Sequence, residues 1–184
     1  MLTRRSVLLG FSVTSLAAHA QPKLGEDGMY HFDWYLESFL DLNEDIESAA
    51  TSGKRLAIIF SQRACPYCKR MAEEHFSTEA IVNYVRSHFE ILHLNLSGAR
   101  EVTDVDGKTM SERDFARRQG VRLTPTIIFY PAKTQGLAQK PAPQREVARM
   151  SGLLEPQSFL AMFRYVKEEG YLNTSFPDWL KQGG

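Results

Sequence analysis

The hydrophobic residues of the chain recur with two kinds of spacing, and each kind predicts a type of secondary structure. Unbroken or alternating apolar residues indicate strands, whereas apolar residues three and four positions apart indicate amphipathic helices. With Ser and Asp as helix caps and Gly as a helix end, this spacing predicts helices at 41–52, 65–75, 78–87, 111–119 and 156–171. It predicts strands at 54–62, 89–96, 121–130 and 145–151.

The first twenty residues have the pattern of an export signal. Arg4 and Arg5 precede the apolar residues 7–18, and Ala18-His19-Ala20 fits a cleavage site. The apolar stretch is too short to span a membrane. The arginine pair favours a twin-arginine signal, with the Sec route as the alternative. Removal of residues 1–20 would leave 164 of the 184 residues, enough for one domain with its own core.

Residues 21–40 are expected to form an N-terminal extension of the folded domain. The polar residues 21–28 predict a flexible leader, and the unusually aromatic residues 29–40 predict packing over the core. The domain itself is expected to span residues 41–172. Residues 173–184 contain Phe and Trp, and we expect this C-terminal tail to dock on the domain.

Two polar segments interrupt the hydrophobic pattern inside the domain. Residues 98–119 are an insertion, in which Asp106-Gly107 predicts a tight turn. The acidic residues here lack the ligand spacing of a calcium loop, so we expect a solvated hairpin that carries Glu101, Asp104 and Asp106. Residues 131–144 are rich in Pro, Gln and Lys and predict an exposed loop.

The charge balance gives no sign of a polyanionic partner. The chain has 22 basic and 22 acidic residues. Loss of Arg4 and Arg5 with the signal would leave a net charge of −2, because residues 1–20 contain no acidic residue. We therefore expect neither nucleic acid nor an anionic membrane surface as a partner, and we expect a monomer.

The chemistry of the chain is concentrated in its only two cysteines, Cys65 and Cys68, which flank Pro66 and Tyr67. They lie between the first predicted strand and a predicted helix, which is the context of a redox Cys-x-x-Cys motif. Backbone N–H groups and the helix dipole at the helix N-terminus would lower the pKa of Cys65 and make it the nucleophile. Cys68 lies one turn further on the same face, so it can attack a mixed disulfide at Cys65.

Two other interpretations of the cysteine pair stay open. Zinc requires about four ligands, and no second cysteine pair exists to supply them. A copper(I) site formed by Cys65, Cys68 and Met71 is the metal alternative, and a purely structural disulfide is the other. Redox exchange is favoured, because an exported chain with one close pair of cysteines does not use disulfides as a scaffold.

The predicted order of a βαβ unit followed by a ββα unit is that of the α/β thioredoxin fold, a central mixed β-sheet flanked by helices. The chain resembles the thioredoxin superfamily in Cys65-Pro66-Tyr67-Cys68, in Val121-Arg-Leu-Thr-Pro125-Thr and in the strand and helix around Gly152. In residues 38–46, 53–56, 101–107 and 116–126 it resembles, more narrowly, the SoxW-type periplasmic thioredoxins, which are associated with bacterial sulfur oxidation.

The resemblance implies a thiol–disulfide oxidoreductase whose redox-active disulfide is Cys65–Cys68, with no other cofactor and no metal. It implies that Cys65 attacks and Cys68 resolves. It also implies a cis peptide before Pro125 and places Pro66, Tyr67, Thr124 and Pro125 against the substrate chain.

Two positions depart from the cytoplasmic thioredoxins. Ile59 stands where they carry a buried Asp, and Ala64 stands where they carry a Trp before the first cysteine. We therefore expect Glu73, Glu74 or a water to assist Cys68, or the resolving step to be slower.

The function expected from these observations is reduction of client-protein disulfides in the periplasm, with re-reduction by a membrane electron donor of the DsbD or CcdA kind. The resemblance suggests a sulfur-carrier protein as the client. Two alternatives are a DsbA-like oxidase, favoured by positive charge at Arg63, Lys69 and Arg70, and a non-enzymatic copper(I)-binding module.

Overall fold

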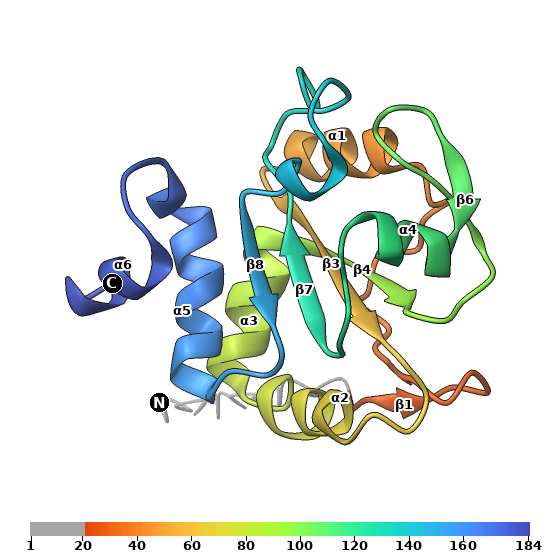
Figure 1. Ribbon diagram of the computed structural model, residues 1–184. Helices are drawn as coiled ribbons and strands as arrows, with labels where there is room; N and C mark the ends of the chain where they lie inside the picture. The colour runs from red at the N-terminus through yellow and green to blue at the C-terminus, as the bar shows by residue number, and fades with distance from the viewer. Residues whose placement is uncertain (1–20) are drawn as a thin grey trace, which may run out of the picture.

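The computed structural model describes residues 21–184, so the predicted signal at 1–20 lies outside the described residues. Four strands form the central sheet in the order β4-β3-β7-β8 (Figure 1). β3 (Arg55–Ser61) runs parallel to β4 (Phe89–Asn95) and antiparallel to β7 (Thr126–Phe129). β7 in turn pairs antiparallel with β8 (Ala148–Ser151). This is the predicted mixed sheet.

Helices cover both faces of the sheet, which explains the unbroken apolar run of its central strand. Ala57 and Ile59 of β3 pack with α3 (Glu79–His88) and α5 (Pro156–Lys167) in one buried cluster. The alternate residues of β3 pack with α1 (Leu42–Thr51) and α4 (Glu112–Arg118) in the other cluster. Successive side chains of a strand point to opposite faces, so β3 must be apolar at both.

Helix boundaries follow the predicted caps. Asp41 accepts hydrogen bonds from the backbone N–H groups of Asn43 and Glu44 at the start of α1, and Ser111 caps α4 in the same way. The predicted helix at 156–171 ends earlier, at Lys167, and a 3₁₀ turn follows at Gly170–Leu172. Glu169 has a left-handed backbone with φ of 57°, which a continuous helix does not permit.

The predicted flexible leader is wrong from Lys23 onward. β1 (Lys23–Leu24) and β2 (Tyr30–His31) form an antiparallel hairpin, called here the N-terminal hairpin. Gly28 supplies the positive φ of its turn, and the side chain of Met29 is 2% exposed. The predicted packing of the aromatic residues is confirmed for Phe32, whose ring is buried against Trp34, Tyr35 and Phe76, but not for Phe39, which is 99% exposed.

The insertion is a hairpin as predicted, but it is only partly solvated, since Glu101 and residues 107–109 are exposed. β5 (Glu101–Thr103) pairs with β6 (Thr109–Ser111) around the Asp106-Gly107 turn. Asp104, however, is fully buried. Its carboxylate lies 2.7 Å from Arg145, which belongs to a segment 41 residues further along the chain. The acidic pattern gave no local sign of this distant partner.

The loop at 131–144 is not uniformly exposed either. Leu137 is 3% exposed and joins the cluster beneath α1 and α4, and a 3₁₀ turn follows at Ala142–Gln144. The predicted strand at 145–151 begins later, at Ala148, because the buried Arg145 side chain forms ion pairs with Asp104 and Asp106.

The C-terminal tail docks as predicted. Its helix α6 (Phe176–Lys181) lies beside α5, and the rings of Trp179 and Tyr165 are 5.7 Å apart (Figure 1). Across residues 21–184, none of the helices combines the length and the apolar character that crossing a bilayer requires.

Candidate functional site

The carboxyl end of β3 leads directly into the cysteine pair. After Ser61 the chain turns through Gln62, Arg63 and Ala64, and Cys65 caps α2 (Pro66–Arg70). α2 continues into a π-helical turn at Met71–His75, so the predicted helix at 65–75 is present with its second half widened. Cys65 and Cys68 form a disulfide, and their Cα atoms are 5.2 Å apart.

The sulfur of Cys65 lies within reach of two hydrogen-bond donors. The backbone N–H of Cys68 donates to Cys65 Sγ at 3.1 Å, and Thr124 Oγ1 donates to it at 3.3 Å. The backbone oxygen of Thr124 lies 3.6 Å from the same sulfur. Both donors would stabilise a thiolate at Cys65 after the disulfide is reduced.

Thr124 and Pro125 reach the disulfide because β7 is the neighbour of β3 in the sheet. The peptide between them is cis, as predicted. Pro125 is buried and its carbonyl accepts a hydrogen bond from Gly152 N, which ties this loop to the end of β8. Segments almost sixty residues apart in the sequence therefore meet at one sulfur atom.

The surface around the disulfide carries exposed apolar side chains. Tyr67 is 58% exposed, and Leu123, directly before Thr124, is 47% exposed. Cys65 and Cys68 are 8% and 5% exposed. Pro66 and Tyr67 are predicted from the sequence to face the substrate chain, whereas Leu123 is not among the predicted site residues. An apolar residue directly before the Thr-Pro pair is a signal that could have identified it.

The carboxylates expected to assist Cys68 lie elsewhere. Ile59 is fully buried among apolar residues. Glu73 and Glu74 are exposed, and they form ion pairs with Lys69 and Arg70. The expectation that either glutamate replaces the buried acid of cytoplasmic thioredoxins is therefore wrong, because both face solvent on the outer side of the helix.

The cations near Cys65 are also partnered. Arg63 donates to the backbone oxygen of Glu26 at 2.7 Å, and Arg70 bonds to Glu74 and to Glu155. The ion pair with Glu74 raises the pKa of Arg70. Lys69 Nζ lies 3.8 Å from Glu73. The positive charge of Lys69 and Arg70 is therefore offset by carboxylates, whereas Arg63 bonds to a neutral backbone oxygen.

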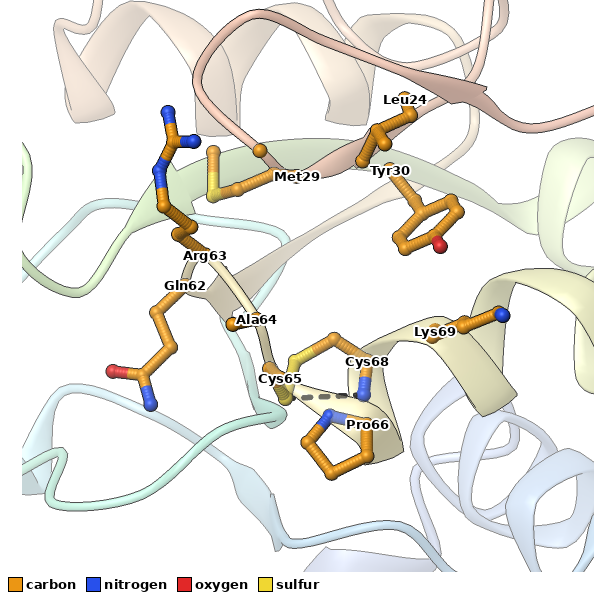
Figure 2. A pocket seen from close by; sticks show the side chains of 11 residues that line it. Leu24, Met29, Tyr30, Gln62, Arg63, Ala64, Cys65, Pro66, Cys68 and Lys69 are labelled. Carbon is orange, nitrogen blue, oxygen red and sulfur yellow. Dashed lines mark hydrogen bonds between the residues drawn. A yellow bond between two sulfur atoms is a disulfide. The ribbon is translucent and has the colours of Figure 1, made fainter.

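A cavity of about 380 Å³ opens beside the disulfide (Figure 2). One wall is the active-site segment, including Ala64, Cys65 and Cys68. The opposite wall is the N-terminal hairpin, from which Leu24 and Tyr30 point toward the disulfide segment. The sequence pattern does not predict that this hairpin belongs to the site.

Met71, the methionine of the copper(I) alternative, and the nearby His75 are both buried. The side chain of Met71 is 2% exposed and belongs to the apolar core on the α3 and α5 side of the sheet. His75 is fully buried, and its Nε2 donates to the carbonyl of Leu154 at 2.8 Å. Over residues 21–184, His, Cys, Asp and Glu side chains do not gather in groups of three or more suited to a metal ion.

Comparison with known proteins agrees with this architecture. Residues 42–167 match the profile of the Thioredoxin-like domain family. A thioredoxin-fold protein from Helicobacter pylori is 21% identical with a TM-score of 0.56, and the match covers 76% of this chain and 89% of that one. The DsbH oxidoreductase is 13% identical with a TM-score of 0.51, over 87% of this chain and 95% of that one.

Both structural likenesses lie at low identity, so they show the fold alone. None of the curated proteins matches the chain significantly.

Proposed function

The chain belongs to the thioredoxin-like domain family, and from that premise we propose that it is a thiol–disulfide oxidoreductase that reduces disulfides of client proteins. The observation that carries thiol–disulfide exchange is the surrounding of Cys65 Sγ, and the reductive direction rests on the resemblance to SoxW-type periplasmic thioredoxins. This sulfur lies at a helix start, is joined to Cys68, and accepts hydrogen bonds from Cys68 N and Thr124 Oγ1. Such a surrounding stabilises the thiolate, which is the reactive form of cysteine.

The proposed reaction has two exchange steps. The Cys65 thiolate attacks one sulfur of the client disulfide, and the second client sulfur leaves as a thiolate that takes up a proton. Cys68 then loses its proton and attacks Cys65 Sγ, which releases the first client sulfur. Two electrons have passed to the client, and the product is the Cys65–Cys68 disulfide seen in the structure.

The second step needs a base that takes the proton of Cys68. The described carboxylates that lie nearest to Cys68 in the sequence do not supply this base. Cys68 is 5% exposed, whereas Glu73 and Glu74 lie at the surface. We propose that water takes the proton through the cavity beside the disulfide, because Cys68 is one of its lining residues.

The proposal places the protein in the periplasm, with residues 1–20 as its export signal and a membrane donor of the DsbD or CcdA kind as its source of electrons. The support is the sequence pattern of residues 1–20 and the resemblance to SoxW-type thioredoxins. A client in bacterial sulfur oxidation rests on that resemblance alone, by analogy. We also propose that the protein acts as a monomer.

Reduction of insulin disulfides by the chain without residues 1–20, with dithiothreitol as donor, tests the proposed activity. The wild type is expected to accelerate the reaction. Cys65→Ser is expected to abolish the acceleration, because the remaining Cys68 lies one turn into the helix, away from the two donors at Cys65, and has no second thiol to complete the exchange. A Cys65→Ser protein that is as active as the wild type would refute the assignment.

An oxidase of client thiols is the second candidate, favoured by the two donors on Cys65 Sγ. Stabilisation of the thiolate stabilises the reduced protein and raises the reduction potential. Equilibration with glutathione distinguishes the two directions. A potential well above about −200 mV would favour the oxidase, and a value closer to about −270 mV would favour the reductase.

A further inference from the structure

The N-terminal hairpin lies over the cysteine pair and is fastened to it. Arg63, two residues before Cys65, donates to the backbone oxygen of Glu26 in the hairpin turn at 2.7 Å. Gly28 in the same turn lies against the Arg63 side chain, where an added Cβ would be 2.8 Å from Arg63 Cγ. The hairpin therefore has a fixed position relative to the disulfide.

The space between the hairpin and the disulfide is predominantly apolar. Leu24, Met29 and Tyr30 line it from the hairpin, and Ala64, Pro66 and both cysteines line it from the active-site segment (Figure 2). Arg63 and Lys69 are its charged lining residues, and no acidic residue is among them. The volume of about 380 Å³ lies at the small end of the range of ligand pockets, about 300–1,000 Å³.

Leu24 is the side chain that the fold itself does not explain. It is 63% exposed on a two-residue strand, and it points toward the disulfide segment. A leucine in this position gains by apolar burial only when something else fills the cavity. The cavity borders both sulfurs. A group that fills the cavity therefore lies next to the molecule that is bonded to Cys65 during the reaction.

We propose that the N-terminal hairpin forms a specificity groove, which holds a large apolar side chain next to the reacting cysteine of a polypeptide client. This inference rests on the proposed function and names its substrate class: cysteine-containing peptides with apolar neighbours. Small thiols such as glutathione, which carry carboxylates and no large apolar group, do not fill the groove. Ala64, with its small side chain, leaves the groove open on the disulfide side.

A mixed-disulfide equilibrium tests the groove without requiring turnover. In Cys68→Ala protein carrying glutathione on Cys65, a peptide thiol displaces glutathione. The bond from Cys65 to the glutathione sulfur breaks, the bond to the peptide sulfur forms, and the proton of the peptide thiol passes to glutathione. Three probe peptides carry one cysteine flanked on both sides by Leu, by Ser or by Asp.

The exchange constant is expected to be about tenfold larger for the Leu peptide than for the Ser peptide, because leucine buries several more apolar groups. Leu24→Asp is expected to remove this preference, and Leu24→Met to keep it. Leu172→Asp is the matched control, since Leu172 is 68% exposed on the C-terminal side of the molecule and should leave the preference intact. Gly28→Ala, which displaces Arg63, is expected to weaken the preference without adding charge.

Equal constants for the Leu and Ser peptides, or a preference that survives Leu24→Asp, would overturn the proposal. A preference for the Asp peptide would also overturn it, by showing that Arg63 and Lys69 rather than the apolar wall select the client. Failure of the proposed reductase function would appear separately, as an absence of insulin reduction by the wild type.

Discussion

Thr124 and the backbone of Cys68 act on the same sulfur, but only Thr124 does so through a side chain that can be changed. Its hydroxyl stabilises the thiolate of the reduced protein more than the neutral thiol. Thr124→Val keeps the shape of the side chain and removes this donor. A hydrogen bond of this kind contributes about 0.5–1.5 kcal/mol.

We therefore expect Thr124→Val to move the pH profile of Cys65 alkylation upward by about 0.5–1 pH unit. The measurement is the rate of iodoacetamide labelling of the reduced protein across pH. Thr103→Val is the control, because the Thr103 hydroxyl bonds to Thr109 and not to the cysteines. An unshifted profile for Thr124→Val would show that the hydroxyl does not stabilise the thiolate.

His93 is the residue on which the acid stability of the fold depends most directly. It is 8% exposed, packs against Tyr35 and His31, and its Nδ1 has no hydrogen-bond partner. Burial, with smaller effects of the nearby His31 and Arg100, lowers the pKa of His93 to about 3 against the opposing effect of Asp27. The folded protein therefore holds a neutral imidazole across the pH range in which an unfolded chain takes up a proton.

The unfolded chain protonates this histidine below pH about 6.5, whereas the folded protein keeps it neutral. The stability that the neutral histidine contributes is therefore complete above that pH and is lost as the pH falls. At pH 5 the loss is about 2 kcal/mol. His93→Phe, which retains an aromatic ring, is expected to lose correspondingly less stability between pH 7.5 and 5. Urea unfolding at the two pH values measures the difference.

Asp45 is expected to change the pH dependence of stability in the direction opposite to that of His93. Burial raises the pKa of Asp45 to about 6 against the opposing hydrogen bond from Ser38. Its protonation in the folded state favours folding as the pH falls toward 5. Asp45→Asn should therefore lose more stability on acidification than the wild type.

Identical pH dependence in the wild type and His93→Phe would refute the assignment to His93.

Among the elements, α6 illustrates docking through few contacts. None of its residues is fully buried, yet Trp179 packs on Tyr165 of α5, and Tyr165 Oη donates to the carbonyl of Thr174 at 2.6 Å. Gly170 allows this approach, because a Cβ there would lie 2.5 Å from the Tyr165 ring. The tail thus covers the side of α5 that the sheet leaves open.

We expect Trp179→Ala to lower the free energy of unfolding by about 1–2 kcal/mol, because the aromatic contact and its apolar area are lost. Disulfide reduction should be unaffected, since α6 lies away from α2, the helix that Cys65 caps (Figure 1). Phe39→Ala is the matched control, because Phe39 is 99% exposed and should change stability by less than about 0.5 kcal/mol. Equal effects of the two substitutions in denaturant unfolding would contradict the docking.

The N-terminal hairpin shows why a polar segment can be misjudged. Its composition resembles that of a linker, and its two strands have two residues each. What orders it is contact with the rest of the chain: burial of Met29, the bond from Arg63 to Glu26, and the ion pair of Lys23 with Asp33. The spacing of hydrophobic residues cannot predict strands of only two residues each.

At the scale of the whole molecule, a buried ion cluster joins the insertion to the loop before β8. Asp104 and Asp106 face Arg118 and Arg145, and both aspartates contact both arginines. The distances from Asp104 are 2.7 Å to Arg145 and 3.1 Å to Arg118. Two negative and two positive groups cancel, which permits their burial. The arginines hold the pKa of Asp106 well below its usual range.

Removing one member should leave a buried charge without a counter-charge. We expect Asp104→Ala to destabilise the protein by about 3–5 kcal/mol, measured by denaturant unfolding. Adding Arg145→Met should restore part of this loss, because the stranded guanidinium is then removed as well. Lys181→Ala, which breaks the exposed Lys181–Asp178 pair, is the control and should leave the midpoint unchanged. A double variant less stable than Asp104→Ala would refute this account.

The sequence predicts the four strands of the central sheet and most residues of the disulfide site. The strands carry unbroken or alternating apolar residues whose period is local, and Asp41 and Ser111 mark helix starts by their own side chains. The cysteine pair and Thr124-Pro125 are short motifs that can be recognised without knowledge of the fold. The place of Leu123 directly before Thr124-Pro125 is a usable signal, whereas nothing in the sequence of the N-terminal hairpin shows that it lies beside a disulfide.

The sequence by itself determined the main helices and strands of the domain, their order and the place of the cysteine pair at a helix start, because each depends on spacing within a few residues. Only the tertiary structure decided which distant groups share one environment. It placed Thr124 against Cys65, turned Glu73 and Glu74 outward, buried Asp104 with Arg145 and set Leu24 over the disulfide. These outcomes depend on how layers pack across long sequence separations, where no local pattern names the partner.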